Sequence, residues 1–340
     1  MTQSFQRIGI IGGGAWGTAL ALVLQRAGRQ ALLWAREAEV VLSVNTRHEN
    51  NFFLPGIELT AQIRATNNLS DLAACDAVLL VTPTQYTRVT CKQFAKGSGS
   101  HKPPIIICAK GLEAKTGKLL TEIVSEELPD RPVAVLSGPS FAIEVARDKP
   151  AALTLAVEDK QLGAAIAQGF SSRHFRLYHT PDIIGAQIGG AIKNVMAVAC
   201  GITAGFRMGD NARAAIITRG LAEMMRFGAA LGGRSETLMG LSGLGDLVLT
   251  CSSVQSRNMS LGMALGQGTI LADILAKRAG VTEGVFTAAA AAALARKHNI
   301  EMPICTAVDA VLNRGATLED TIEQLLSRPL KAESDWSAPT

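Results

Sequence analysis

Short apolar runs alternate with longer amphipathic stretches through the first half of the chain. Runs of this kind, bounded by turn residues, are typical of buried strands, and apolar residues at helical spacing indicate the helices between them. Strands are predicted at residues 5–11, 30–34, 63–65, 77–81, 104–108 and 133–136, and helices at 15–25, 37–44, 87–94 and 119–127. Strands that alternate with helices predict an α/β fold with a doubly wound parallel sheet.

The pattern changes after Thr180-Pro181-Asp182. Two late apolar runs, 151–156 and 175–178, are predicted to extend the same sheet. The remainder is helical in pattern and rich in Ala, Gly and Met, with glycine-rich breaks at 232–233 and 240–245. We therefore predict three segments: a sheet domain over 1–182, an all-helical domain over 183–327, and a polar tail over 328–340.

The first predicted strand runs directly into Gly12-x-Gly14-x-x-Gly17. Gly12 permits a tight turn, Gly14 lets the main chain approach a pyrophosphate, and Gly17 lets the next helix pack close to the sheet. That helix directs its N-terminal amides at the phosphates. This context predicts an NAD(P)-binding domain of the Rossmann type.

The end of the second strand bears on the choice of cofactor. In NAD-binding sheets an acidic residue there holds the ribose 2′-hydroxyl. Here Ala35 occupies the approximate acidic position and Arg36 follows it. The sequence therefore favours NADP(H) and tolerates NAD(H). Glu37 leaves an alternative, because a shift of one register position would make it the ribose ligand.

Composition narrows the class of protein. The 340 residues are 48% hydrophobic and 18% charged, which is typical of two globular domains. A net charge of +4 without basic clusters suits small anions and argues against nucleic acid. The cysteines and histidines form no metal-spaced cluster or C-x-x-C pair, so we expect no metal site and a reducing, cytoplasmic location. Glycines interrupt the uncharged stretch between Arg7 and Arg26, so no membrane insertion is expected.

Three residues stand out as candidates for chemistry. Lys110 lies two residues after the strand at 104–108, where ligands bind in such sheets, although a solvated lysine ending a strand is the alternative. Lys193 lies on a glycine-lined apolar helix, where a charge is costly without a task or a partner. A lysine in an ion pair at a domain interface is the alternative. Asp246, after Gly243-Leu244-Gly245, is either a loop cap or a carboxylate oriented toward a lysine.

Two helix starts leave similar alternatives open. Ser256-Arg257-Asn258 precedes a helical stretch, so these residues either cap that helix or bind a phosphate through free amides and a guanidinium. Glu283, in Val281-Thr282-Glu283-Gly284, reads as an ordinary acid at a helix start unless something places it at the cofactor.

A series of motifs in the same order over nearly the whole chain resembles the bacterial NAD(P)-dependent glycerol-3-phosphate dehydrogenase family. These motifs are residues 12–17 with Trp16, 51–56, 109–113, 137–142, 189–195, 211–214, 243–247, 255–258 and 281–284. The resemblance implies reversible hydride transfer between dihydroxyacetone phosphate and sn-glycerol 3-phosphate, supplying the backbone of phospholipids. It also implies a helical C-terminal domain like that of 6-phosphogluconate dehydrogenases, and a homodimer.

The resemblance assigns roles to individual residues. It implies that Lys193 donates and accepts the proton. It implies a substrate site of Lys110, Gly138, Ser140, Lys193, Asp246, Ser256, Arg257 and Asn258. The implied cofactor contacts are Gly12, Gly14, Ala15, Trp16, Gly17, Arg36, Phe53, Lys110, Ala142, Arg257, Val281 and Glu283. Ala15 is often Ser in the family, so only its backbone amide can serve the phosphate here.

Two alternative functions are weighed against this one. The 6-phosphogluconate and hydroxyisobutyrate dehydrogenases share the architecture and a catalytic lysine-asparagine region, but Ser256-Arg257-Asn258 favours a short phosphorylated substrate. A regulator that only senses NADPH would bind the cofactor without turnover. Such a sensor needs no lysine placed like Lys193.

Overall fold

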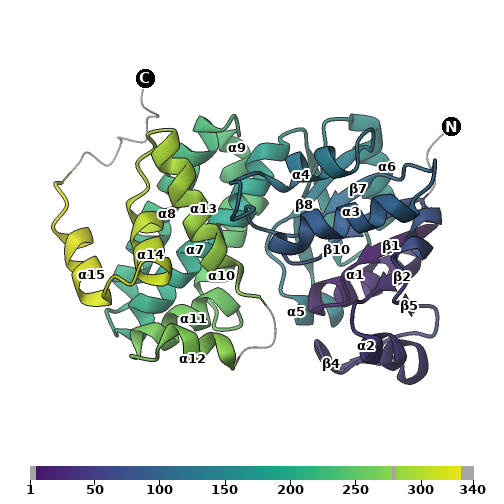
Figure 1. Ribbon diagram of the computed structural model, residues 1–340, viewed down its shortest axis with the longest axis horizontal. Helices are drawn as coiled ribbons and strands as arrows, with labels where there is room; N and C mark the ends of the chain where they lie inside the picture. The colour runs from purple at the N-terminus through teal and green to yellow at the C-terminus, as the bar shows by residue number, and fades with distance from the viewer. Residues whose placement is uncertain (1–4, 278–280, 331–340) are drawn as a thin grey trace. The chain divides into compact units, whose positions relative to one another are not determined.

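The computed structural model describes residues 5–277 and 281–330, which form two compact units (Figure 1). Unit 1 contains the described residues up to Ala109 together with Leu120–Ile183. Unit 2 contains Lys110–Leu119 and the described residues from Ile184 onward. Of the predicted polar tail, 328–330 form no helix or strand, and 331–340 lie outside the described residues.

Unit 1 is built on an eight-stranded sheet in the order β10-β9-β8-β7-β6-β1-β2-β5. The strands are β1 (Arg7–Ile11), β2 (Gln30–Trp34), β5 (Arg64–Thr66), β6 (Ala77–Leu80), β7 (Ile105–Ile107), β8 (Val133–Ser137), β9 (Ala151–Ala156) and β10 (Phe175–Thr180). From β5 to β8 every neighbouring pair is parallel, with the strand order of a doubly wound dinucleotide-binding sheet. The predicted fold class is confirmed.

Strands β9 and β10 extend this sheet where the late apolar runs predicted them, but they run the other way. β9 pairs with β8 antiparallel, through Leu136↔Leu155, and β10 pairs with β9 in parallel. The chain returns after Ser137 through the short helix α5 (Ala142–Ala146). A return of this kind places the next strand beside β8 in the opposite direction, whereas a parallel neighbour needs a full crossover.

Helices flank the sheet, and their buried faces supply much of the core of unit 1. They are α1 (Ala15–Arg26), α2 (Ala38–Leu42), α3 (Thr87–Gly97), α4 (Leu120–Glu127), α5 and α6 (Lys160–Phe170). The helix predicted at 37–44 forms as α2 but ends at Leu42, and a π-helical turn, η1 (Ser43–Arg47), follows it. A small antiparallel pair, β3 (Glu49–Asn50) and β4 (Leu54–Glu58), follows it and was not predicted. The buried Asn50 amide ties this region to the glycine turn by donating 2.8 Å hydrogen bonds to the Gly13 carbonyl and to Thr18 Oγ1.

Unit 2 is helical around one long central helix, α7. Its helices are α7 (Ile183–Gly205), α8 (Asp210–Ala230), α9 (Ser235–Leu238), α10 (Asp246–Cys251), α11 (Arg257–Gly266), α12 (Leu271–Ala276), α13 (Glu283–Lys297), α14 (Pro303–Asn313) and α15 (Leu318–Leu326). Gly201 of α7 and Gly262 of α11 sit backbone to backbone, because a Cβ on either would lie about 2 Å from a carbonyl oxygen of the other helix. Such contact explains the abundance of small residues in these helices.

Among the described residues, α7 is the one helix long and apolar enough to cross a membrane by length and composition. Most of its apolar window, 83%, is buried inside the protein. Side chains such as Ile188, Met196 and Cys200 are fully buried in the core of unit 2. The apolar character of α7 is therefore that of a core helix.

The two units differ from the predicted domains in one segment. The predicted sheet domain over 1–182 includes Lys110–Leu119, whereas in the structure this segment groups with unit 2. Leu112 is fully buried in the same apolar cluster as Ile188 and Val195. Gly117, with φ of 74°, lets the Leu294 side chain approach to 3.2 Å from the position of a Cβ. The segment Lys110–Leu119 belongs to unit 2 because Leu112 is buried in the core of that unit. The local sequence pattern after β7 does not reveal this burial.

Candidate active site

The three fingerprint glycines of unit 1 have three different surroundings. Gly12 has φ of 132°, and a Cβ there would lie 2.9 Å from the Val81 carbonyl. A Cβ on Gly17 would lie 1.9 Å from the Gly12 carbonyl oxygen, so α1 packs directly on the turn. Nothing among the described residues lies within 4 Å of the position of a Cβ on Gly14. The turn is therefore closed at Gly12 and Gly17 and open at Gly14, where backbone can approach a ligand.

The N-terminus of α1 has the character of an anion site. Gly14 is its N-cap, so no side chain satisfies the first amides, and the first turn contains no acidic residue. Ala15 and Trp16 begin the helix. Trp16 Nε1 is buried and has no hydrogen-bond partner within the described part of the chain. Free helix amides and an orphaned donor suit a phosphate-bearing ligand.

The end of β2 pairs the two residues between which the sequence could not decide. Arg36 Nη2 lies 2.8 Å from Glu37 Oε1, and Arg36 Nε donates to the same oxygen at 3.1 Å. The Arg36 side chain is 75% exposed. Ala35 is fully buried against Gly13, where a Cβ would lie 2.5 Å from the Ala35 Cβ. A carboxylate in place of Ala35 would have no room, so the charged side chains at this end of β2 are those of the exposed Arg36 and its partner Glu37.

The remaining predicted residues of unit 1 lie at or near the ends of strands. Gly138 follows β8 with φ of 145°, close to the Leu153 backbone. Ser140 Oγ donates to the Gly138 carbonyl at 3.0 Å, and Ala142 begins α5. Phe53 lies between β3 and β4, half-buried against the core of unit 1. Apart from the aromatic Phe53, these positions provide backbone groups and small side chains, and none of them carries a charge.

Unit 2 brings two lysines and one carboxylate into direct contact. Lys193 Nζ of α7 lies 2.6 Å from Asp246 Oδ1, and Lys110 Nζ lies 2.7 Å from Asp246 Oδ2. Asp246 begins α10 and is 1% exposed. Of the two alternatives for Asp246, the structure therefore shows the carboxylate oriented toward lysines. Each carboxylate oxygen meets a different ammonium.

Burial and charge act in opposite directions on these groups. Burial lowers the pKa of Lys193 to about 8, an effect strengthened by the nearby charge of Lys110 and opposed by Asp246. Burial would raise the pKa of the Asp246 carboxyl, but the two ammonium groups outweigh it and hold that pKa below its usual value. Asp246 therefore stays charged, while Lys193 can exchange a proton near neutral pH.

A chain of amides continues from the lysines toward α13. Asn194 Nδ2 donates to the Lys110 carbonyl at 3.1 Å, and Asn258 Nδ2 donates to Asn194 Oδ1 at 2.9 Å. Asn258 Oδ1 in turn accepts from the Gly284 amide at 2.9 Å. Ser256 Oγ accepts from the Met259 amide at 3.2 Å as the N-cap of α11. Capping is thus one role of Ser256, whatever else it binds.

The other predicted residues of unit 2 stand at helix starts. Arg257 is the first residue of α11 and is exposed, and Glu283 is the first residue of α13. Val281 lies just before α13, partly buried. A guanidinium beside the N-terminal amides of α11 forms a surface that can hold a small anion.

Sequence reasoning missed two polar members of this group. Lys193 Nζ donates to Thr250 Oγ1 at 2.9 Å, and Thr250 lies one helical turn after Asp246. Asn194 was noted only as part of a motif. The signal that could have identified Thr250 is its spacing of four residues from Asp246, which places both on one face of a helix.

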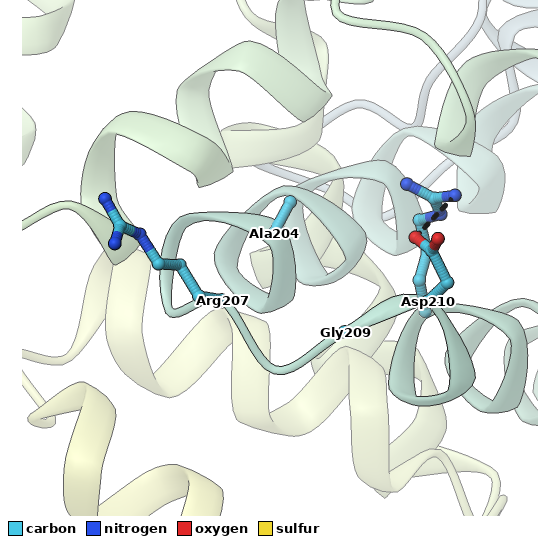
Figure 2. A pocket seen from close by; sticks show the side chains of 5 residues that line it. Ala204, Arg207, Gly209 and Asp210 are labelled. Carbon is cyan, nitrogen blue, oxygen red and sulfur yellow. Dashed lines mark ion pairs between the residues drawn. The ribbon is translucent and has the colours of Figure 1, made fainter.

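A separate pocket in unit 2 is lined by Ala204, Arg207, Gly209, Asp210 and Arg213. Figure 2 shows the Arg207 side chain extending away from the ion pair between Asp210 and Arg213, whose N···O distance is 2.9 Å. Because the two guanidinium groups diverge and one is already paired, the pocket does not gather charge for an anion. None of the predicted site residues lines it.

Comparison with known proteins gives consistent matches over nearly the whole chain. The family model for the N-terminus of NAD-dependent glycerol-3-phosphate dehydrogenase matches residues 7–163, and the model for its C-terminus matches residues 182–323. The curated glycerol-3-phosphate dehydrogenase [NAD(P)+] of Parvibaculum lavamentivorans is 53% identical over 98% of this chain and 100% of that protein. The protein of the same name from Caulobacter vibrioides is 54% identical with the same coverage. The crystal structure of glycerol-3-phosphate dehydrogenase from Coxiella burnetii superposes with a TM-score of 0.91 at 38% identity, covering 95% of this chain and 99% of that one.

Proposed function

This chain belongs to the family of NAD-dependent glycerol-3-phosphate dehydrogenases, and on that premise we propose how its own residues bind the ligands and carry out the reaction. The chain is an oxidoreductase that uses a nicotinamide cofactor, as its sequence predicted. The proposed reaction is reversible hydride transfer between dihydroxyacetone phosphate and sn-glycerol 3-phosphate. The bound nicotinamide supplies the hydride in the direction of ketone reduction.

Unit 1 is the proposed binding site of the cofactor. The turn is open at Gly14, and the α1 amides are available to a pyrophosphate. The orphaned Trp16 Nε1 is a further donor that fits such a ligand. Arg36 is the proposed contact of a 2′-phosphate, which would replace Glu37 as its partner. The proposed preference for NADPH, with tolerance of NADH, is supported by this exposed guanidinium next to Ala35, a position without the carboxylate that would select NADH.

Lys193 is the proposed proton donor. Ketone reduction creates negative charge on the carbonyl oxygen, and a protonated amine within reach can neutralise it. An ordinary lysine, with a pKa of about 10.4, gives up its proton reluctantly at neutral pH. The pKa of about 8 makes Lys193 a better acid, and it can accept the proton in the reverse reaction. The single observation that carries the proposal is this buried lysine bound to Asp246 and Thr250.

Asp246 and Thr250 position the amine. They accept two of the three hydrogen bonds that an ammonium can donate, which leaves one for the substrate oxygen. Lys110, on the other Asp246 oxygen, adds positive charge that favours a developing alkoxide.

Arg257 is the proposed anchor of the substrate phosphate, with Ser256 and Asn258 beside it. Gly138 and Ser140, which the family resemblance implies as substrate contacts, stay part of the proposal. The support is a guanidinium at the N-terminus of α11, where helix amides favour an anion. Binding energy from the phosphate can then orient the remote carbonyl. The remaining cofactor contacts, Phe53, Ala142, Val281 and Glu283, stay part of the same proposal. So do a homodimer, a cytoplasmic location and a role in phospholipid synthesis.

The proposed function is tested by the oxidation of NADPH, and separately of NADH, followed by absorbance with dihydroxyacetone phosphate as substrate. We expect turnover with both cofactors and little with unphosphorylated dihydroxyacetone. The reverse assay with sn-glycerol 3-phosphate should regenerate the reduced cofactor. Cofactor binding without turnover of either phosphate would instead support the non-catalytic sensor.

A further inference from the structure

A buried hydroxyl just after β6 has no role in the proposed function so far. Thr82 follows Val81 at the carboxyl end of that strand and is only 5% exposed. Its Oγ1 has no hydrogen-bond partner among residues 5–277 and 281–330. Burying a hydroxyl without a partner is unfavourable, so such a group calls for an explanation.

The backbone of Thr82 lies against the first glycine of the phosphate-binding turn. The Val81 amide donates to the Ile11 carbonyl at 2.9 Å, which continues the ladder between β6 and β1. A Cβ on Gly12 would lie 2.9 Å from the Val81 carbonyl carbon and 3.1 Å from the Thr82 nitrogen. The unpaired hydroxyl therefore belongs to the residue that abuts the turn.

The order of the strands determines which half of a dinucleotide reaches this point. The chain proceeds from β1 outward through β2 to β5, and then returns to β6 on the other side of β1. The order reverses between β1 and β6, and dinucleotides cross a doubly wound sheet at such a switch point. Because β2 carries the adenosine side, β6 lies on the nicotinamide side, next to the pyrophosphate.

We propose that the Thr82 hydroxyl hydrogen-bonds the nicotinamide-side ribose-phosphate portion of the bound cofactor. The inference rests on the proposed function and adds a contact to it. A hydroxyl can donate to a phosphate oxygen and can also accept from a ribose hydroxyl, so it matches either group in this portion. The bound cofactor would thereby give the Thr82 hydroxyl the hydrogen-bond partner that the described residues do not provide.

The test compares Thr82→Val, which removes the hydroxyl and keeps the branched shape, with Thr82→Ser, which keeps the hydroxyl. Dissociation constants are measured by fluorescence titration with NADPH and by calorimetry with adenosine 2′,5′-bisphosphate, which contains only the adenosine end. Thr82→Val should weaken NADPH about three- to tenfold and leave the bisphosphate unchanged. Thr82→Ser should keep NADPH within about twofold of the wild type.

Thr87→Val is the matched control. Thr87 is buried as well, and its hydroxyl likewise has no partner in the described chain, but it lies in the first turn of α3. This variant should leave NADPH affinity unchanged. Without cofactor, Thr82→Val should melt no lower than the wild type, because valine removes an unpaired polar atom. A structural role would instead lower the melting temperature.

Three results would overturn the inference. Unchanged NADPH affinity in Thr82→Val, with normal binding by the wild type, would show that the hydroxyl does not contact the cofactor. Equal losses for NADPH and the bisphosphate would assign Thr82 to the fold of the turn. A wild type that binds neither NADPH nor NADH would overturn the proposed function, and this inference with it.

Discussion

Unit 1 and unit 2 prepare for their proposed ligands by different physical means. Unit 1 presents backbone: an open position at Gly14, unsatisfied helix amides and small side chains near strand ends. Unit 2 presents charge: two ammonium groups that share one buried carboxylate. Backbone groups cannot titrate, so the binding role of unit 1 should change little with pH, whereas the chemistry of unit 2 should depend on pH strongly. Substitutions can test this division.

The largest effect is expected from Lys193→Met, which removes the proton donor and keeps the length of the side chain. Turnover should fall roughly 10²- to 10⁴-fold, the usual contribution of a general acid. NADPH affinity should stay near that of the wild type, because the proposed cofactor turn lies in unit 1. Steady-state kinetics and a fluorescence titration measure the two quantities.

Lys297→Met is the control for Lys193→Met, since Lys297 is an exposed lysine at the end of α13. It should leave both turnover and NADPH affinity unchanged. Near-normal turnover in Lys193→Met would show that Lys193 is not the proton donor. It would also contradict the claim that charged groups of unit 2 carry out the chemistry.

Arg257→Ala tests whether unit 2 also anchors the substrate. Loss of a charge-assisted contact to the phosphate should raise the KM for dihydroxyacetone phosphate about ten- to a hundredfold. The rate with unphosphorylated dihydroxyacetone should stay at its low wild-type value. The comparison is the ratio of kcat/KM for the two ketones, and a ratio that stays at the wild-type value would place the phosphate elsewhere.

The pH profile addresses the division directly. The pKa of Lys193 is lowered to about 8, so the amine is protonated below that pH and neutral above it. Ketone reduction needs the proton, and its kcat should fall about tenfold per unit as pH rises beyond 8. Oxidation of glycerol 3-phosphate needs the neutral amine and should rise over the same range.

Asp246→Asn sharpens this prediction, because the carboxylate raises the pKa of Lys193. Its loss should move the basic limb of the reduction profile to lower pH. The affinity for NADPH, whose proposed binding site is in unit 1, should show no such decrease with rising pH. A reduction profile that is flat between pH 7 and 9 in the wild type would contradict the role of Lys193.

The smallest effect is expected at the exposed end of β2. Arg36→Ala should weaken NADPH about tenfold and leave NADH within about threefold, because solvent and salt screen this exposed guanidinium. The measurement is the KM for each cofactor at low ionic strength. Glu37→Gln is the companion variant, since it removes the carboxylate that pairs with Arg36 and should favour NADPH slightly. Equal losses for both cofactors in Arg36→Ala would withdraw the preference for NADPH.

The sequence alone determined the class of fold and the family. Alternating strands and helices, the glycine spacing at 12–17 and the change of pattern after residue 182 are local signals, set by periodicity and turn chemistry. The collinear motifs named the candidate residues of both units. These signals depend on neighbours within a few residues, and they are therefore legible without any tertiary contact.

Only the tertiary structure decided what those candidates meet. Lys110 and Asp246 are 136 residues apart in the chain, and Lys193 and Asp246 are 53 apart, so no local pattern could reveal that one carboxylate serves both amines. The same holds for the antiparallel β9, the transfer of Lys110–Leu119 to unit 2, and the orphaned hydroxyl of Thr82. In each case the outcome depends on burial and pairing between distant segments, which packing alone establishes.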